Sequence, residues 1–171
     1  MCQYCELIKK EALYKDEKIA IILDPKPATT GHLLVLPVEH KTILEEVPDF
    51  VVDKLFIGSN KASSLLFDLF PEVQGTNILI ENGVAAGQEM PHLALNVIPR
   101  KENDGLNLIW QPKQFSEEEM STIELKLKEE TTGIGVFEKE AKTPEVIEEA
   151  EKIEIGEDEE DYRIKQLRRI P

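Results

Sequence analysis

The order of apolar segments along the chain predicts an α+β fold with an antiparallel sheet. Two short apolar runs, at residues 18–24 and 31–36, come before a long amphipathic stretch at 49–70. Two further short runs follow it, at 76–81 and 92–98. Strands that are grouped on either side of one helix, with short links inside each group, favour antiparallel pairing over the strand–helix alternation of a parallel sheet.

The first two predicted strands are bounded by residues that interrupt a sheet. The run KIAIILD ends at Pro25, and the run GHLLVL lies between Gly31 and Pro37. A proline has no N–H to donate to a neighbouring strand, so each run ends where a proline begins. Because the link between them is short, the two runs are expected to pair with each other.

The stretch 49–70 predicts the main helix. Pro48 and Pro71 stand just outside it, and proline is tolerated at the ends of a helix but not in its interior. Gly58 lowers the helix propensity without breaking the pattern. The apolar residues that recur at near-helical spacing are Phe50, Val51, Leu55, Phe56, Ala62, Leu65, Leu66, Phe67 and Leu69.

Composition limits the class of protein. A chain of 171 residues is long enough to bury a core in one domain with an appendage. A net charge of -14 argues against a nucleic-acid backbone as the main partner, since binding a polyanion requires a basic patch. The sequence has neither an amino-terminal signal pattern nor a run of about 18 apolar residues, so we expect a cytoplasmic protein without a membrane segment.

A change of character after Trp110 predicts an extension to a domain that occupies residues 1–110. Residues 111–137 form a helical region, in which Ser116 is followed three residues later by Glu119, the spacing of a capping box. The apolar residues expected on one face of that helix are Met120, Ile123 and Leu127.

The last predicted segment, residues 138–171, is an acidic tail with a basic and apolar end. Residues 138–161 contain 12 acidic and 3 basic residues, which indicates a solvated helix or a disordered linker rather than a binding surface. The final DYRIKQLRRIP is either a segment that pairs with the acidic stretch or a short docking motif. Removal of the tail after about Glu130 is expected to leave the domain folded.

The most distinctive stretch is NGVAAGQEMPHLALNVIPR, residues 82–100. Successive side chains of a strand point to opposite faces, so His92, Ala94 and Asn96 are expected to share one face. The loop before them allows close backbone approach, and its N–H groups can face an anion. The residues of that loop are Asn82, Gly83, Gly87 and Gln88.

Two cysteines and two histidines form a candidate metal site. Cys2 and Cys5 are the only cysteines, and a C-x-x-C pair without secretory context favours metal binding over a disulfide. Together with His40 and His92 they offer two sulfurs and two imidazoles, the donor set of a closed tetrahedral zinc site. The alternative is that the cysteines are merely small buried groups.

These motifs resemble the signature of the histidine triad (HIT) nucleotide-binding proteins, in which NG, AGQ and three alternating histidines precede Pro-Arg. On that pattern His92 matches the first histidine, whereas Ala94 and Asn96 stand where the second and third are expected. In the family the second histidine is the nucleophile, and a methyl group has neither a lone pair nor a labile proton. The resemblance therefore implies the fold and a nucleotide site, with the catalytic nucleophile missing at Ala94.

The resemblance also implies a structural zinc ion and a set of nucleotide-binding residues. Several family members bind zinc through positions that match Cys2, Cys5, His40 and His92. An acidic residue at the place of Asp24 receives the ribose hydroxyls. The remaining residues of the expected nucleotide site, matched to the family or to the strand face, are Asn77, Asn82, Gly87, Gln88 and Asn96.

Two further side chains near this site carry alternative interpretations. Glu89 stands where some members have serine, and a carboxylate there repels an oxyanion unless it is paired or turned away. His32 opens the second strand, where a lone histidine is more often a hydrogen-bonded structural side chain than a catalytic group. We interpret His32 as structural.

The sequence supports one leading function and two alternatives. The leading interpretation is a zinc-stabilised nucleotide-binding protein that holds a nucleoside monophosphate or related nucleotide and has lost hydrolysis. The first alternative is a hydrolase of nucleoside phosphoramidates or dinucleoside polyphosphates, or an inactivated form of one. The second is a dimeric scaffold or interaction module, because the resemblance implies a homodimer formed through the long helix and a sheet strand.

Overall fold

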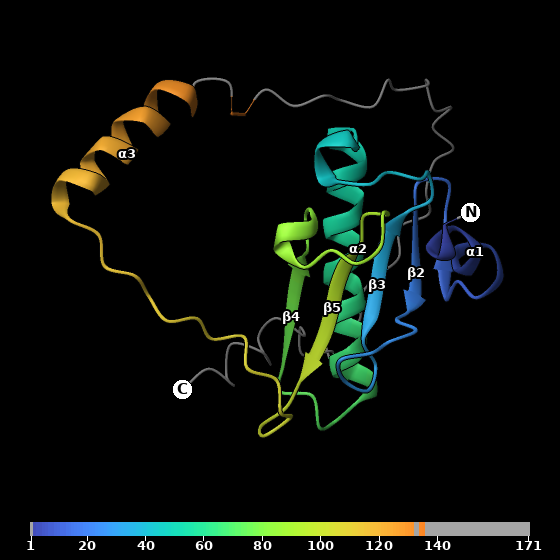
Figure 1. The fold of residues 1–171 in the computed structure, drawn as a ribbon. Helices are drawn as coiled ribbons and strands as arrows, with labels where there is room; N and C mark the ends of the chain where they lie inside the picture. Colours follow the sequence, from blue (N-terminus) through green and yellow to red (C-terminus); the bar gives the residue numbers. More distant parts are fainter. Residues whose placement is uncertain (1, 132–133, 136–171) are drawn as a thin grey trace, which may run out of the picture. The chain divides into compact units, whose positions relative to one another are not determined.

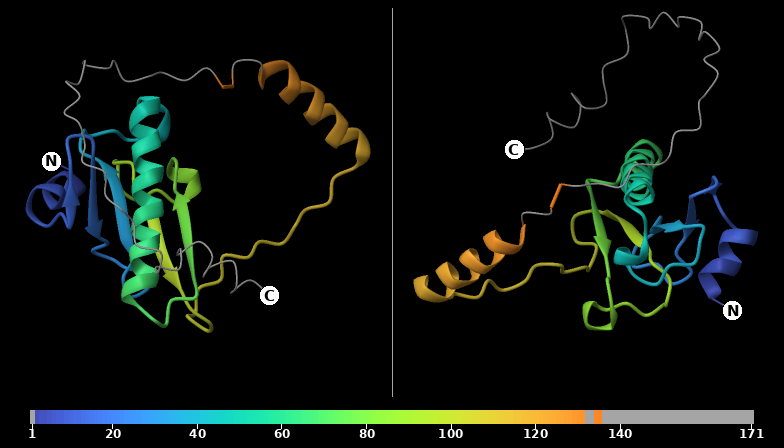
Figure 2. Two further views of the ribbon diagram at one scale, coloured as in Figure 1. Left: turned by 180° about the vertical axis from the view of Figure 1, so that it is seen from behind. Right: turned by 90° about the horizontal axis from the view of Figure 1, so that it is seen from above.

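The computed structural model describes residues 2–131 and 134–135 and contains the predicted antiparallel sheet. The sheet has five strands in the order β1-β2-β3-β5-β4, and the long helix α2 covers one of its faces (Figures 1 and 2). The strands are β1 (Tyr14–Lys15), β2 (Ile19–Leu23), β3 (Leu33–Pro37), β4 (Gly75–Ile80) and β5 (Leu95–Arg100). The helices are α1 (Gln3–Lys10), α2 (Asp49–Leu69) and α3 (Glu117–Glu130), with short 3-10 turns η1 (Leu44–Glu46) and η2 (Val84–Ala86).

The strand pairing brings the two halves of the domain together in the middle of the sheet. β2 and β3 pair in antiparallel register, as the short link between them predicted. β5 pairs with β3 on one side and β4 on the other, with Asn96 opposite both Leu34 and Leu79. The residues after β3 and those before β5 therefore lie at the same end of the sheet, and the β2–β3 connection lies at the other end.

The helix α2 packs closely on the sheet at Gly58. A Cβ atom added to Gly58 would lie 2.9 Å from Ile19 Cδ1 and 3.3 Å from Val35 Cγ1, so a larger side chain would push the helix away. This contact explains why a residue of low helix propensity stands inside the helix. The buried residues of this core include Leu33, Val35, Leu55, Leu66, Leu95 and Val97.

A smaller core lies on the opposite face of β2 and β3, under α1. Alternate residues of these strands point away from α2, and Ala20, Ile22 and Leu34 pack with Ile8 of α1. No helix was predicted from the sequence in the first 14 residues. The segment forms α1, whose Leu7 and Ile8 cover this second face.

The strand predicted at residues 92–98 begins three residues later, at Leu95, and runs to Arg100. The backbone before it leaves the sheet, because the N–H of Leu93 donates to the Lys41 carbonyl at 2.7 Å and that of His92 donates to the Met90 carbonyl at 2.8 Å. His92 and Ala94 therefore belong to the approach to the strand rather than to the strand itself.

The predicted helix beyond residue 110 is α3, and it begins with the predicted capping box. Ser116 Oγ accepts the N–H of Glu119 at 3.2 Å, and a Glu119 carboxylate oxygen accepts the N–H of Ser116 at 2.9 Å. None of its residues is buried. The predicted acidic tail, residues 138–171, lies outside the described residues.

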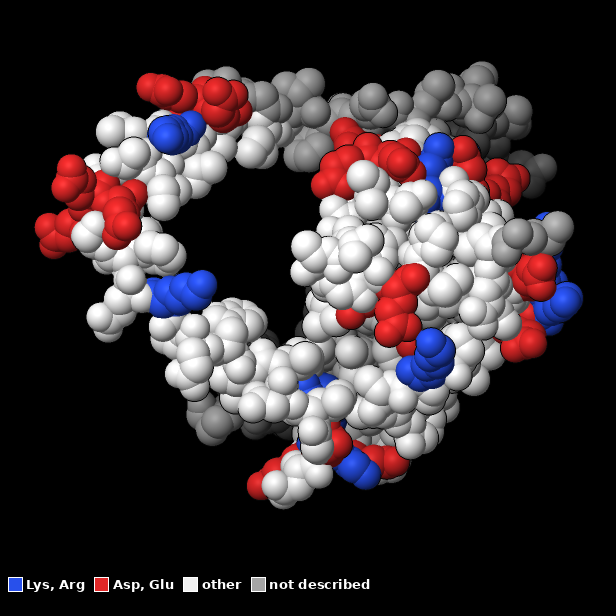
Figure 3. All heavy atoms as spheres, in the orientation of Figure 1, with Lys and Arg blue, Asp and Glu red and all other residues white. Residues whose placement is uncertain are grey.

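The distribution of Lys and Arg on the surface agrees with the negative net charge of the sequence (Figure 3). On the face shown in Figure 3, the Lys and Arg side chains of the described residues form no continuous patch. Within the described part of the chain, no helix combines the length and the apolar character needed to cross a membrane.

Candidate metal centre and adjoining pocket

The four predicted metal ligands meet in one cluster. The ligand atoms of Cys2, Cys5, His40 and His92 all lie within 4.8 Å of one another. Cys2 is the N-cap residue of α1 and Cys5 lies in its first turn, so the C-x-x-C spacing turns both sulfurs to one side of the helix. His40 follows β3 and His92 precedes β5, and the pairing of these two strands brings the histidines to the same end of the sheet.

The distances inside the cluster fit a tetrahedral ion. With zinc–nitrogen and zinc–sulfur bonds of about 2.05 and 2.3 Å, the edges of a tetrahedron measure about 3.3 Å between two nitrogens and about 3.6 Å between nitrogen and sulfur. His40 Nδ1 and His92 Nδ1 are 3.3 Å apart. Cys5 Sγ lies 3.4 Å from each of these nitrogens, and Cys2 Sγ lies 3.6 Å from His92 Nδ1.

The ring of His92 is held in the tautomer that a metal requires. Its Nε2–H donates to the Pro37 carbonyl at 3.0 Å, so the Nδ1 lone pair faces the two sulfurs. Burial lowers the pKa of His92, and the neighbouring His40 ring adds to that shift. Burial and the Cys2 sulfur raise the pKa of the Cys5 thiol, so two thiolates here require a cation between them.

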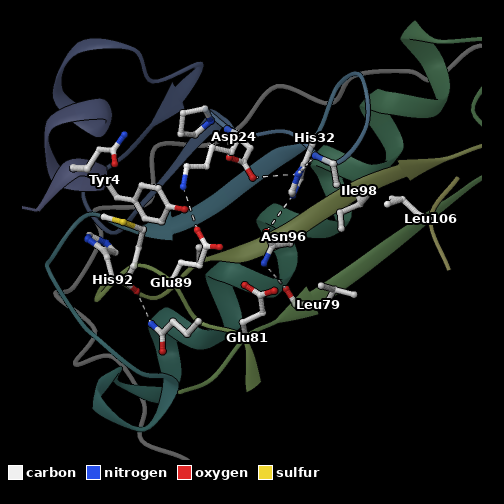
Figure 4. A pocket seen from close by; sticks show the side chains of 18 of the residues that line it. Tyr4, Asp24, His32, Leu79, Glu81, Glu89, His92, Asn96, Ile98 and Leu106 are labelled. Carbon is white, nitrogen blue, oxygen red and sulfur yellow. Dashed lines mark hydrogen bonds and ion pairs between the residues drawn. The ribbon is translucent and has the colours of Figure 1, made fainter. Parts of the chain in front are cut away.

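A pocket of about 360 Å³ adjoins the cluster and shares His92 with it (Figure 4). The β2–β3 connection contributes Asp24 and His32, and the loop after β4 contributes carboxylate and glycine residues. The approach to β5 contributes Ala94 and Asn96. The predicted residues Asp24, Gly87, Gln88, Ala94 and Asn96 therefore line a single cavity.

A chain of hydrogen bonds crosses one wall of this pocket. His32 Nε2 lies 3.1 Å from Asn96 Oδ1, and Asn96 Nδ2 donates to the Leu79 carbonyl at 3.4 Å. Because the amide nitrogen faces that carbonyl, its oxygen faces His32, which requires the proton on Nε2. His32 Nδ1 then accepts the N–H of Ala28 at 3.2 Å, with Asp24 Oδ2 also 3.2 Å away.

His32 is thus both structural, as predicted, and part of the pocket wall, which the sequence reasoning missed. It is buried, and that burial lowers its pKa, against the opposing charge of Asp24. The signal in the sequence was weak, because nothing near His32 in the sequence indicates that it contacts Asn96. Its contact with Asn96 joins positions 64 residues apart.

Two residues expected at the nucleotide lie elsewhere. Asn77 and Asn82 are absent from the pocket lining. Asn77 Oδ1 accepts a hydrogen bond from the Arg100 guanidinium. Asn82 bridges η1, because its Oδ1 accepts the N–H of Leu44 at 2.9 Å and its Nδ2 donates to the Glu45 carboxylate.

The glycine-rich loop also satisfies its own polar groups. The Gly83 N–H donates to Gln88 Oε1 at 2.8 Å, and Gln88 Nε2 donates to the carbonyls of Thr42 and Met90. The N–H groups of Gly87 and Gln88 donate to the carbonyls of Val84 and Gly83. The N–H groups of Gly83, Gly87 and Gln88 therefore have acceptors within the loop, and the expectation that they face an anion stays a prediction.

The pocket is acidic. Asp24, Glu81 and Glu89 line it, and among the described lining residues Lys26 is the only Lys or Arg. Burial raises the pKa of Glu81, and the charges of Glu89 and Asp24 raise it further. Burial and the same three carboxylates raise the pKa of Tyr4 to about 12.

Comparison with known proteins identifies the family. A family model described as the HIT domain matches residues 6–103. Adenosine 5'-monophosphoramidase HNT1 of Candida albicans is 31% identical over 137 residues, which are 75% of this chain and 90% of that protein. Adenylylsulfatase HINT3 of Arabidopsis thaliana is 36% identical over 112 residues, 61% of this chain and 55% of that longer protein.

A solved structure supports the same assignment. The crystal structure of a Zn-bound histidine triad family protein from Mycobacterium smegmatis is 30% identical, with a TM-score of 0.58. The match covers 75% of this chain and 94% of that one. With the sheet order, the ligand cluster and the family match in agreement, the chain belongs to the HIT domain family.

Proposed function

We propose that this protein is a zinc-stabilised nucleotide-binding member of the HIT family that has lost histidine-based hydrolysis. The observation that carries the proposal is Ala94, a methyl side chain in the pocket at the position that matches the family nucleophile. A nucleotidyl transfer through that position needs a lone pair to attack phosphorus, which alanine does not have.

Neither histidine of the pocket offers a substitute for that nucleophile. His92 directs Nε2 to the Pro37 carbonyl and Nδ1 to the cysteine sulfurs. His32 directs Nε2 to Asn96, and its Nδ1 lies between the Ala28 N–H and Asp24. Each ring nitrogen therefore already has a partner, and the histidines serve the metal cluster and the pocket wall.

The remaining lining suits the nucleoside part of a ligand. Asp24 Oδ2 lies at the pocket wall, and a carboxylate there can accept the hydrogen bonds of ribose hydroxyls. Leu79, Met90 and Ile98 add apolar surface, which a purine or pyrimidine ring can cover. The names of two relatives, a monophosphoramidase and an adenylylsulfatase, support an adenine nucleotide as the first ligand to examine.

Zinc has a structural part in this proposal. Cys2, Cys5, His40 and His92 would hold the ion, which joins α1 to the end of β3 and to the approach to β5. Because it joins these elements, the ion would contribute to the free energy of folding. Four protein ligands leave no coordination position for a substrate, so the ion would be structural and not catalytic.

Calorimetric titration of the full chain with adenosine and AMP tests the proposed binding. We expect saturable binding with an affinity in the millimolar range or tighter, and a loss of binding in Asp24→Asn. The control is Asp68→Asn, an exposed residue of α2 outside the pocket. If neither ligand binds at millimolar concentration, the scaffold alternative replaces this proposal.

A further inference from the structure

The groups expected to hold a phosphate in this pocket are already used by the protein. Gln88 Nε2 donates to the carbonyls of Thr42 and Met90, and Asn82 Nδ2 donates to the Glu45 carboxylate. The N–H groups of Gly83 and Gly87 donate to acceptors within their own loop. Arg100 is a cation near β4, but its guanidinium binds Asp104, Asn77 and the Leu106 carbonyl and does not line the pocket.

The charges that do line the pocket are mostly negative. Figure 4 shows Asp24, Glu81 and Glu89 around the same space, with Tyr4 beside them. Lys26 Nζ lies 3.2 Å from Glu89 Oε2, so the one lysine of the lining is paired with one of these carboxylates. Among the described lining residues, three carboxylates therefore share the pocket with one ammonium group.

We infer that Glu81 and Glu89 are specificity-determining residues that make the pocket favour an uncharged nucleoside over the corresponding nucleoside monophosphate. The inference rests on the proposed function and specifies which of its two test ligands, adenosine or AMP, the pocket favours. Asp24 differs from the other two, because its carboxylate is held against the β2–β3 connection by the Lys26 N–H and lies beside His32. Glu81 and Glu89 instead present charge where a phosphate would add its own.

The size of the effect follows from exposure. Glu81 and Glu89 are both exposed, so water and salt reduce their repulsion of a phosphate. The repulsion between two unit charges about 8 Å apart, largely screened by water, lowers the affinity by a factor of about three. Removal of both charges is therefore expected to raise the affinity for AMP about tenfold and to change the affinity for adenosine less than about twofold.

The experiment compares adenosine and AMP on the full chain by calorimetry. The parent protein should bind adenosine at least as tightly as AMP, and Glu81→Gln with Glu89→Gln should shift the preference towards AMP. The control is Asp68→Asn with Glu72→Gln, which changes the net charge equally at two exposed positions outside the pocket. That control should leave the preference unchanged.

A salt titration of the parent protein provides a second measurement that needs no variant. Screening weakens repulsion, so AMP binding should strengthen relative to adenosine binding as NaCl is raised. Tighter binding of AMP than of adenosine by the parent, a shift of equal size in the control, or AMP binding that weakens with salt would overturn the inference. Failure of both ligands to bind parent and variant alike would overturn the inference together with the proposed function.

Discussion

The metal cluster and the pocket meet at His92, but only the metal cluster keeps all the side chains that the family pattern expects. The cluster has all four ligands at distances that fit a tetrahedral ion. The pocket has Ala94 and Asn96 at the positions where the family pattern has its other two histidines. His92 explains the difference, because both of its nitrogens serve the cluster and the adjacent carbonyl. In this chain, the presence of His92 therefore does not by itself indicate catalysis.

The change Ala94→His is expected to give the largest effect. It restores an imidazole to the pocket, so hydrolysis of adenosine 5'-phosphoramidate should rise by about 10³-fold or more over the parent protein. Asn96 in place of the third histidine should hold the rate below that of an ordinary family member. Release of AMP from equal preparations of both proteins measures the effect.

The control for this change is Ala94→Gln, which fills similar space with an amide that is no nucleophile. Equal rates for the histidine and glutamine variants would show that the pocket no longer supports the chemistry. Robust turnover by the parent protein would show that another group performs it.

The change Cys5→Ser tests the metal cluster. It removes one of two sulfurs, so the protein should lose its stoichiometric zinc and about 3–4 kcal/mol of unfolding free energy at free zinc levels far above the dissociation constant. Elemental analysis and thermal unfolding provide the measurements.

A chelator separates loss of the ion from any direct effect of the serine. It should lower the stability of the parent to that of Cys5→Ser and should leave the variant unaffected. A parent protein that carries no zinc when purified without chelator would contradict the prediction.

The change His32→Leu affects the pocket without touching the cluster. It removes the hydrogen bond to Asn96 and the partner of the Ala28 N–H, which should cost about 2 kcal/mol of unfolding free energy. The zinc content should stay at that of the parent. Loss of zinc in this variant would show that the two sites are not independent.

The same variant should alter the pH dependence of stability. Burial lowers the pKa of His32 in the folded state, so between pH 6.5 and that lower pKa the unfolded state binds more protons. The parent should lose stability as the pH falls through this window, by at most about 1.4 kcal/mol per pH unit from this group. Zinc-saturated His32→Leu should show a shallower decline in denaturant unfolding.

Truncation after Glu130 should have the smallest effect. This truncation keeps α3, and the predicted acidic tail that it removes has few apolar groups, so the unfolding free energy should change by less than about 0.5 kcal/mol. Truncation after Glu102 is the matched comparison. It removes Asp104 and Leu106, two partners of Arg100, and should lower the melting temperature measurably.

Local patterns in the sequence predicted much of the secondary structure of this protein. The apolar runs predicted β2, β3, β4 and α2, because strand and helix periods are set by neighbouring residues. The capping box of Ser116 and Glu119 was predicted for the same reason. The four candidate metal ligands were predicted from donor chemistry and family resemblance, since two cysteines and two histidines are a common ligand set of structural zinc.

The tertiary structure alone decided which polar groups remain available to a ligand. Asn82 binds Glu45, Gln88 binds the Thr42 carbonyl and His32 binds Asn96, and each pair is far apart in sequence. Nothing in a local pattern specifies such partners, because they depend on how β3, β5 and the loops come together. A buried or half-buried polar group must find a partner, and where the protein supplies it, that group is no longer free for phosphate.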